Sequence, residues 1–186
     1  MALPQPTPPF TAEDYLLWEE QQPEKHEYVH GETFAMDGAS RRHVTISGNV
    51  FAALDAALEG TPCRTYMADM KLRAEADEAY FYPDVLVTCD AEDHKAEQFM
   101  RAPTLVVEVL SPATAAYDRG DKFAAYRRIP SLKEFVLIDP DRRRIEHYRR
   151  TQETVWELHE IEPEAPLVLP GLEVTIPWDR IFRNVD

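Results

Sequence analysis

The chain has 186 residues and a mass of 21.4 kDa, which is enough for one domain with a buried core and too little for two. Hydrophobic residues make up 44% of the chain and charged residues 29%, a globular balance, and no apolar run reaches the roughly 18 residues of a membrane-spanning helix. The net charge of −14 repels polyanions at long range and argues against nonspecific binding of nucleic acids.

The N-terminal segment, residues 1–9, is rich in proline and lacks the basic and then apolar pattern of a secretory signal. We therefore expect a flexible tail over residues 1–9, a single domain over residues 10–186 and a cytoplasmic location. Cys63 and Cys89 are too few for a disulfide framework and lack the spacing of a zinc site, so we expect reduced, half-buried thiols.

The first part of the chain predicts two helices separated by a hairpin. Thr11 precedes acidic residues that suit a helix N-terminus, and a short helix over residues 15–20 is expected to follow. Residues 26–36 have the character of a hairpin that turns at Gly31. Residues 41–58 repeat their apolar side chains at helical spacing, which makes this the clearest helix of the chain.

The remainder predicts strands around one more helix. Residues 64–74 alternate as a half-buried strand does, and the acidic residues 75–78 form a turn. Residues 80–89 and 104–111 are apolar runs typical of strands buried on both faces. A helix over 118–128 precedes four extended segments at 134–139, 143–148, 155–161 and 167–177. This order predicts an α/β fold: a mixed α+β domain around one sheet, with flanking helices and an N-terminal hairpin.

Two acidic residues interrupt the apolar pattern of the central strands, Asp84 and Glu108. Burying a carboxylate costs several kcal/mol or more unless a cation or strong donors meet it. One possibility is a structural ion pair with an arginine or lysine. The other is a divalent metal held by both carboxylates and a backbone carbonyl, for which we nominate Val109, with waters completing the octahedron that Mg²⁺ prefers.

These residues lie in segments that resemble a known family. Pro83-Asp84 with Glu108-Val109-Leu110 is similar to the metal site of the PD-(D/E)XK nuclease superfamily. The segments HGETFAM, YMADMKLR, YFYPDVLVTCD, PTLVVEVLSPAT and YDRGDKFAAYR resemble the Uma family of restriction-endonuclease-like proteins over about residues 10–176. The resemblance implies a restriction-endonuclease-like core, a Mg²⁺ cofactor with Mn²⁺ as a substitute, and DNA as the substrate.

The sequence departs from the superfamily pattern at Leu110, where a lysine is expected two residues after the acid. Lys122 is our candidate for the missing amine, because Asp118, Lys122 and Tyr126 share one face of the helix that follows the Glu108 strand. Lys71 is the alternative, since an antiparallel register would bring it close to Asp84, although a shift of one residue would turn it away.

Two residues of the N-terminal part match positions that the family shows repeatedly. Glu32 is a candidate additional metal ligand or a residue that holds a water near the metal. His43, in the first turn of the long helix, is either a catalytic residue or an ordinary hydrogen-bonded histidine.

The prediction is therefore a metal-dependent endonuclease in which Asp84 and Glu108 hold Mg²⁺ and Lys122 positions the nucleophile. Cutting both strands of a duplex would favour a homodimer. The alternative is a catalytically inactive module that keeps the nuclease fold and binds a protein or a nucleic acid, which Leu110 and the negative charge favour. A nuclease that acts on RNA or on structured DNA would share the same site.

Overall fold

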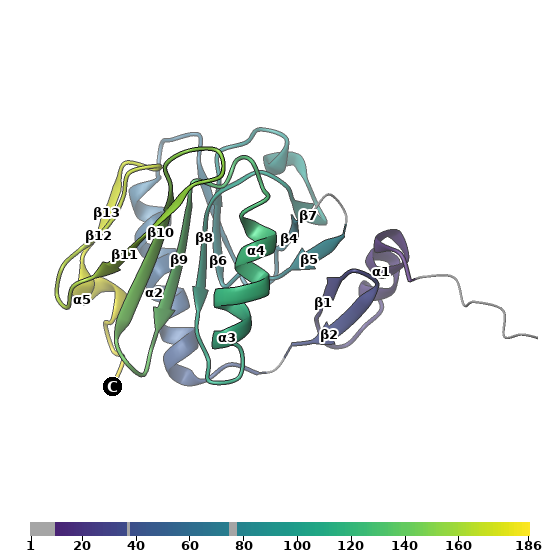
Figure 1. The fold of residues 1–186 in the computed structure, drawn as a ribbon, viewed down its shortest axis with the longest axis horizontal. Helices are drawn as coiled ribbons and strands as arrows, with labels where there is room; N and C mark the ends of the chain where they lie inside the picture. Colours follow the sequence, from purple (N-terminus) through teal and green to yellow (C-terminus); the bar gives the residue numbers. More distant parts are fainter. Residues whose placement is uncertain (1–9, 37, 75–77) are drawn as a thin grey trace, which may run out of the picture.

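A computed structural model describes residues 10–36, 38–74 and 78–186 (Figure 1). The expected tail over residues 1–9 and most of the expected turn over residues 75–78 lie outside these ranges. The helical elements are α1 (Ala12–Glu19), α2 (Arg41–Ala57), η2 (Asp93–Lys95), α3 (Ala115–Tyr117), the π-helical turn η3 (Asp118–Lys122), α4 (Phe123–Tyr126) and α5 (Trp178–Ile181). None of the described helices is long and apolar enough to cross a membrane.

The strands of the described residues fall into sheets of five, six and two strands. The five-stranded sheet has the order β2 (Glu32–Ala35), β1 (His26–Val29), β5 (Ala79–Phe81), β4 (Lys71–Ala74), β7 (Phe99–Met100). The six-stranded sheet has the order β11 (Trp156–Ile161), β10 (Arg144–Arg150), β9 (Glu134–Asp139), β8 (Pro103–Val109), β6 (Val85–Thr88), β3 (Arg64–Met67). Strands β12 (Leu167–Leu169) and β13 (Val174–Ile176) form the third sheet.

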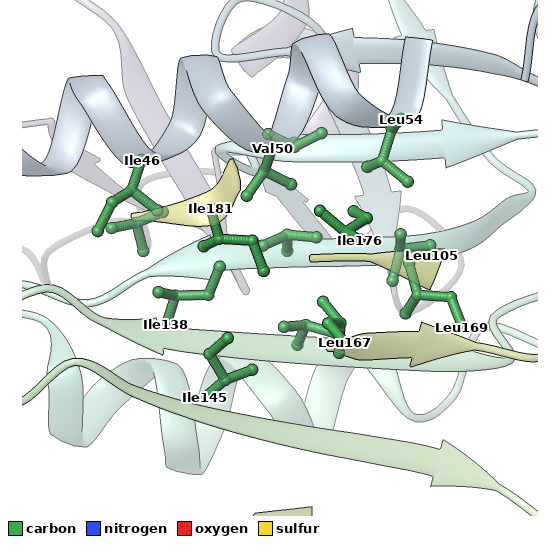
Figure 2. Close-up of a cluster of buried hydrophobic side chains, with 14 of the residues drawn as sticks. Ile46, Val50, Leu54, Leu105, Ile138, Ile145, Leu167, Leu169, Ile176 and Ile181 are labelled. Carbon is green, nitrogen blue, oxygen red and sulfur yellow. The ribbon is translucent and has the colours of Figure 1, made fainter. Parts of the chain in front are cut away.

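Helices cover both faces of the six-stranded sheet (Figure 1). On one face, α2 places Ile46, Val50 and Leu54 against the central strands, as the four-residue spacing of these side chains predicts, and the β12–β13 hairpin and α5 close the same core (Figure 2). On the other face, the helical segment α3–η3–α4 packs against β6, β8 and β9. Because these strands are covered on both sides, most of their side chains are apolar, and the buried Glu108 on β8 is an exception.

The N-terminal elements form a smaller layer beside this core. Thr11 caps α1 through a capping box with Asp14. Below α1, the buried rings of Tyr15, Tyr28 and Tyr80 pack together and join the helix to β1 and β5. The opposite face of the β1–β2 hairpin is therefore free to face the candidate site described below.

The structure confirms the predicted hairpin over residues 26–36 and the predicted long helix, but two predicted strands are wrong in their extent. Residues 64–74 and 80–89 each divide into two strands that belong to different sheets. In the first, Ala68 has a positive φ of 45°, which breaks the extended backbone. In the second, Pro83 lacks the N–H that a continuous ladder requires. The expectation of one sheet is wrong for the same reason.

The expectation of two reduced thiols is also contradicted. Cys63 and Cys89 form a disulfide, with their Cα atoms 3.9 Å apart. The cause is the antiparallel β3–β6 register, in which Arg64 is paired with Thr88. The next position of this register places Cys63 directly opposite Cys89. The register joins residues 26 positions apart, a relation that cysteine spacing alone does not reveal.

Reducing this disulfide is expected to lower the free energy of unfolding by about 2–4 kcal/mol, because the unfolded chain regains the freedom of the closed loop. Urea unfolding with and without a reductant measures the change. As a control, alkylation of the unfolded, unreduced protein should modify no cysteine, and alkylation after reduction should modify both. Two reactive thiols before reduction would contradict the pairing.

Candidate functional site

Asp84 and Glu108 meet because of the pairing between β6 and β8. In this antiparallel ladder Leu86 is opposite Val106 and Val85 is opposite Val107, so the next step of the register places Asp84 opposite Glu108. Side chains of directly opposed residues lie on the same face, with Cβ atoms about 4.5–5.5 Å apart. The two interrupting acids of the sequence therefore come together on the face that α3–η3–α4 covers.

Asp84 is held in place by two hydrogen bonds. The backbone N–H of Val109 donates to its Oδ2 at 2.7 Å, and Nε2 of His43 lies 2.7 Å from its Oδ1. His43 reaches this position from the first turn of α2, where Ser40 caps the helix by accepting from the His43 backbone N–H. The Asp84 side chain is thus fixed between the start of a helix and the end of β8.

Glu108 is almost completely buried and faces the helical segment. Lys122 Nζ lies 3.1 Å from Glu108 Oε1, and the Tyr126 hydroxyl donates to the same oxygen at 2.8 Å. Lys122 Nζ also lies 3.9 Å from Asp118 Oδ1. The predicted shared face of Asp118, Lys122 and Tyr126 is confirmed, although the segment winds as a π-helical turn at Asp118–Lys122.

Glu27 is a site residue that the sequence analysis missed. Its Oε1 lies 2.8 Å from Lys122 Nζ and accepts from the Tyr82 backbone N–H at 3.3 Å. Glu27 lies on β1, two residues before Val29, whose side chain packs against the core of the same face. The signal available in the sequence was an acidic residue, Glu27, among the apolar residues of a predicted strand. The same kind of signal identified Asp84 and Glu108.

The site holds more carboxyl groups than cations, and the pKa values reflect this. Burial raises the pKa of Glu108 to about 8, Lys122 opposes the shift, and the Asp84 carboxylate adds to it. Burial likewise raises the pKa of Asp118. Burial by itself would lower the pKa of Lys122, but Glu108, Glu27 and Asp118 outweigh it and hold that pKa above its ordinary value. The acids around Lys122 therefore favour its charged ammonium form.

Two predicted candidates lie elsewhere. Lys71 follows the β4–β5 register to a place opposite Tyr82, and its Nζ lies 3.3 Å from the Tyr82 hydroxyl rather than beside Asp84. Glu32 lies exposed at the turn end of edge strand β2, opposite Val29, and no described contact joins it to Asp84, Glu108 or Lys122. Glu27, on the paired strand, is instead the N-terminal carboxylate that contacts Lys122.

Leu110, in the position where the superfamily pattern has a lysine, is buried in the core with Phe123 and Tyr126. Because Glu108 and Leu110 share one strand face, a lysine at 110 would also point toward the helical segment. Here Lys122 approaches the acid from that segment instead. The cationic group of the site therefore comes from the helix that packs on the strand.

The donor set fits a hard divalent cation that keeps most of its water. In the described part of the chain, no three or more His, Cys, Asp or Glu side chains are grouped to hold a metal ion. Mg²⁺ requires no such cage, since it commonly binds through one or two carboxylates together with waters and substrate phosphates. The contacts of Lys122 and Tyr126 both go to Oε1 of Glu108, so Oε2 is the oxygen suited to a ligand. Excess negative charge beside Asp84 favours such an ion.

Comparisons with known proteins agree with the fold and the sequence resemblance. A structure titled as a putative nuclease belonging to DUF820 from Anabaena variabilis aligns with a TM-score of 0.75 over 94% of this chain and 98% of that chain, at 19% identity. Two Synechocystis proteins are similar in sequence. The first, uncharacterized protein slr1290, is 38% identical over 97% of this chain and 95% of its own length. The second, uncharacterized protein sll1609, is 37% identical over 83% of this chain and 88% of its own length.

The mixed sheets and flanking helices, together with the structural match, define a mixed α+β fold that this chain shares with that solved structure. A family model with the description "Putative restriction endonuclease" matches residues 12–178. The chain belongs to this family, Uma2, and the resemblance seen in the sequence is confirmed.

Proposed function

We propose that the protein is a metal-dependent endonuclease that hydrolyses phosphodiester bonds of DNA with Mg²⁺, or with Mn²⁺ in its place. The observation that carries the proposal is the placement of Asp84 opposite Glu108, with Lys122 Nζ 3.1 Å from the Glu108 carboxylate. Two acids and a lysine on adjoining elements are the groups that such a nuclease site requires. Membership of the Uma2 family supports a nucleic acid as the substrate.

Asp84, Glu108 and the Val109 carbonyl would hold the ion, which when bound polarises a phosphoryl oxygen and lowers the pKa of a water. His43 and the Val109 N–H orient Asp84 for this task. Lys122 places a positive charge beside the reacting phosphate, where it stabilises developing negative charge. Glu27 binds Lys122 and the Tyr126 hydroxyl binds Glu108, so these two residues hold the Lys122–Glu108 pair in one geometry.

The test incubates the full chain with supercoiled plasmid and Mg²⁺ or Mn²⁺, beside Glu108→Ala and a metal-free control. Nicking or linearisation that requires the metal and is lost in the variant supports the proposal. Cleavage that persists in Glu108→Ala, or no cleavage with any divalent metal on DNA of varied sequence and structure, contradicts it. Sedimentation of the same sample tests the proposed homodimer.

His43 is proposed as a positioning residue that acts through Asp84. His43→Ala is expected to weaken Mn²⁺ binding about 10–100-fold, because residues that orient metal ligands contribute to affinity on this scale. Calorimetric titration of Mn²⁺ measures the effect, and His43→Gln, which keeps a side-chain donor, should recover part of the affinity. Unchanged affinity in His43→Ala would remove His43 from this role.

The alternative function is a nuclease-fold module that binds a partner without cutting. Two observations favour it: Lys122 has only 7% of its side chain exposed and is already paired with acids, and the net charge is −14. Such a module has no need of a metal that depends on Asp84. The same Mn²⁺ titration therefore separates the two functions. A nuclease should bind Mn²⁺ and lose that binding in Asp84→Ala, whereas the module should show no Mn²⁺ binding that depends on Asp84.

A further inference from the structure

Edge strand β2 carries two large apolar side chains that the core does not use. Phe34 is 48% exposed, and Met36, just past the end of the strand, is 37% exposed. In the sheet order β2 has a neighbour on one side only, β1. Exposed apolar side chains placed beside one another on an edge strand require a physical explanation, because burial elsewhere would stabilise the fold.

The register of the hairpin directs Phe34 to the candidate site. Phe34 is directly opposite Glu27, so both side chains lie on the same face with Cβ atoms about 4.5–5.5 Å apart. The Glu27 carboxylate in turn lies 2.8 Å from Lys122 Nζ. Met36, two residues beyond Phe34, lies on the same face, and its backbone N–H donates to Lys25 O at 2.9 Å. Phe34 and Met36 therefore form an apolar surface, here called the β2 shelf, beside Glu27, the carboxylate that pairs with Lys122.

We propose that this β2 shelf stacks against an unpaired nucleobase beside the bond that is cut, so that the preferred substrate is single-stranded or locally unpaired nucleic acid. The inference rests on the proposed function and adds the substrate class. A base within a duplex is covered by its neighbours, whereas an unpaired base offers a free face to an aromatic ring. The overall charge of −14 repels a phosphate backbone at long range, so affinity for nucleic acid has to come from short-range contacts such as stacking.

The test measures binding rather than cleavage. Fluorescence anisotropy of the full chain in EDTA is recorded with a labelled single strand, the same sequence as a blunt duplex, and a duplex with an unpaired loop. Phe34→Ala is expected to weaken binding of the single strand and the looped duplex about 5–100-fold, the range for loss of one stacked base. Phe34→Trp should retain binding. Leu158→Ala, which alters an exposed apolar side chain on β11, is the matched control and should bind as the unaltered chain does.

Three results would overturn the inference. One is equal binding by Phe34→Ala and Leu158→Ala, and another is preferred binding of the blunt duplex. The third is a change from dimer to monomer in Phe34→Ala during sedimentation, which would make the β2 shelf a contact between copies of the chain. Binding that depends on Phe34 without metal-dependent cleavage would support base stacking on the β2 shelf and contradict the proposed endonuclease. Cleavage that does not depend on Phe34 would contradict only the inference.

Discussion

Asp84→Asn is expected to lower the rate of metal-dependent cleavage about 10³-fold or more, since a bound metal contributes several kcal/mol to transition-state stabilisation and each 1.36 kcal/mol is tenfold in rate. The fold should survive, because an asparagine amide can still accept from the Val109 N–H and face His43. The change thus removes a negative charge while keeping the shape. Initial rates of plasmid nicking, with circular dichroism to verify folding, measure the effect.

Asp141→Asn is the matched control for Asp84→Asn. Asp141 pairs with Arg42, the neighbour of His43 in α2, but its side chain is exposed and does not contact Asp84 in the described structure. Its removal should change the nicking rate by less than a few-fold, as expected for a screened surface charge. Equal losses in the two variants would show that general electrostatics, rather than a specific ligand, controls the rate.

Lys122→Met is expected to lower the free energy of unfolding by about 3–5 kcal/mol, because it leaves buried carboxylates without their cation. Glu27, Glu108 and Asp118 all lie within 4 Å of Lys122 Nζ, at 2.8, 3.1 and 3.9 Å. Methionine fills a similar volume, so loss of packing is a small part of the change. Urea unfolding at neutral pH measures the difference.

Two comparisons make the Lys122 result specific. Lys95→Met removes a lysine from an exposed pair with Glu92 and should cost at most about 1 kcal/mol. The double variant Lys122→Met with Glu27→Gln should recover part of the lost stability, since it removes one of the stranded charges. If Lys122→Met costs no more than Lys95→Met, the buried charge cluster does not exist as described.

The sequence predicted the centre of the site because of one physical rule. A carboxylate in an apolar strand must be compensated, and this rule identified Asp84 and Glu108, which the β6–β8 register places opposite each other. Helical spacing identified Lys122 on the face that meets Glu108. Glu27 is harder to identify by this rule, because its strand is short and only the pairing with β2 and β5 places that strand inside the five-stranded sheet.

Features that depend on pairing between distant segments were beyond reach from the sequence. The choice between Lys71 and Lys122 depended on a register, and a shift of one residue reverses the face of a strand. The Cys63–Cys89 disulfide likewise follows from which strand β3 pairs with. The breaks at Ala68 and Pro83 divide two apparent strands between sheets, although proline was a local signal for one of them.

The central claim is that Asp84 and Glu108 hold one divalent ion, and a crystal structure grown with Mn²⁺ and recorded for anomalous scattering tests it most directly. An anomalous peak is expected within about 2.0–2.6 Å of a carboxylate oxygen of each residue, the range for hard divalent cations with oxygen ligands. A fully occupied crystal without a peak between these carboxylates, or with the ion bound to other residues of the chain, would contradict it.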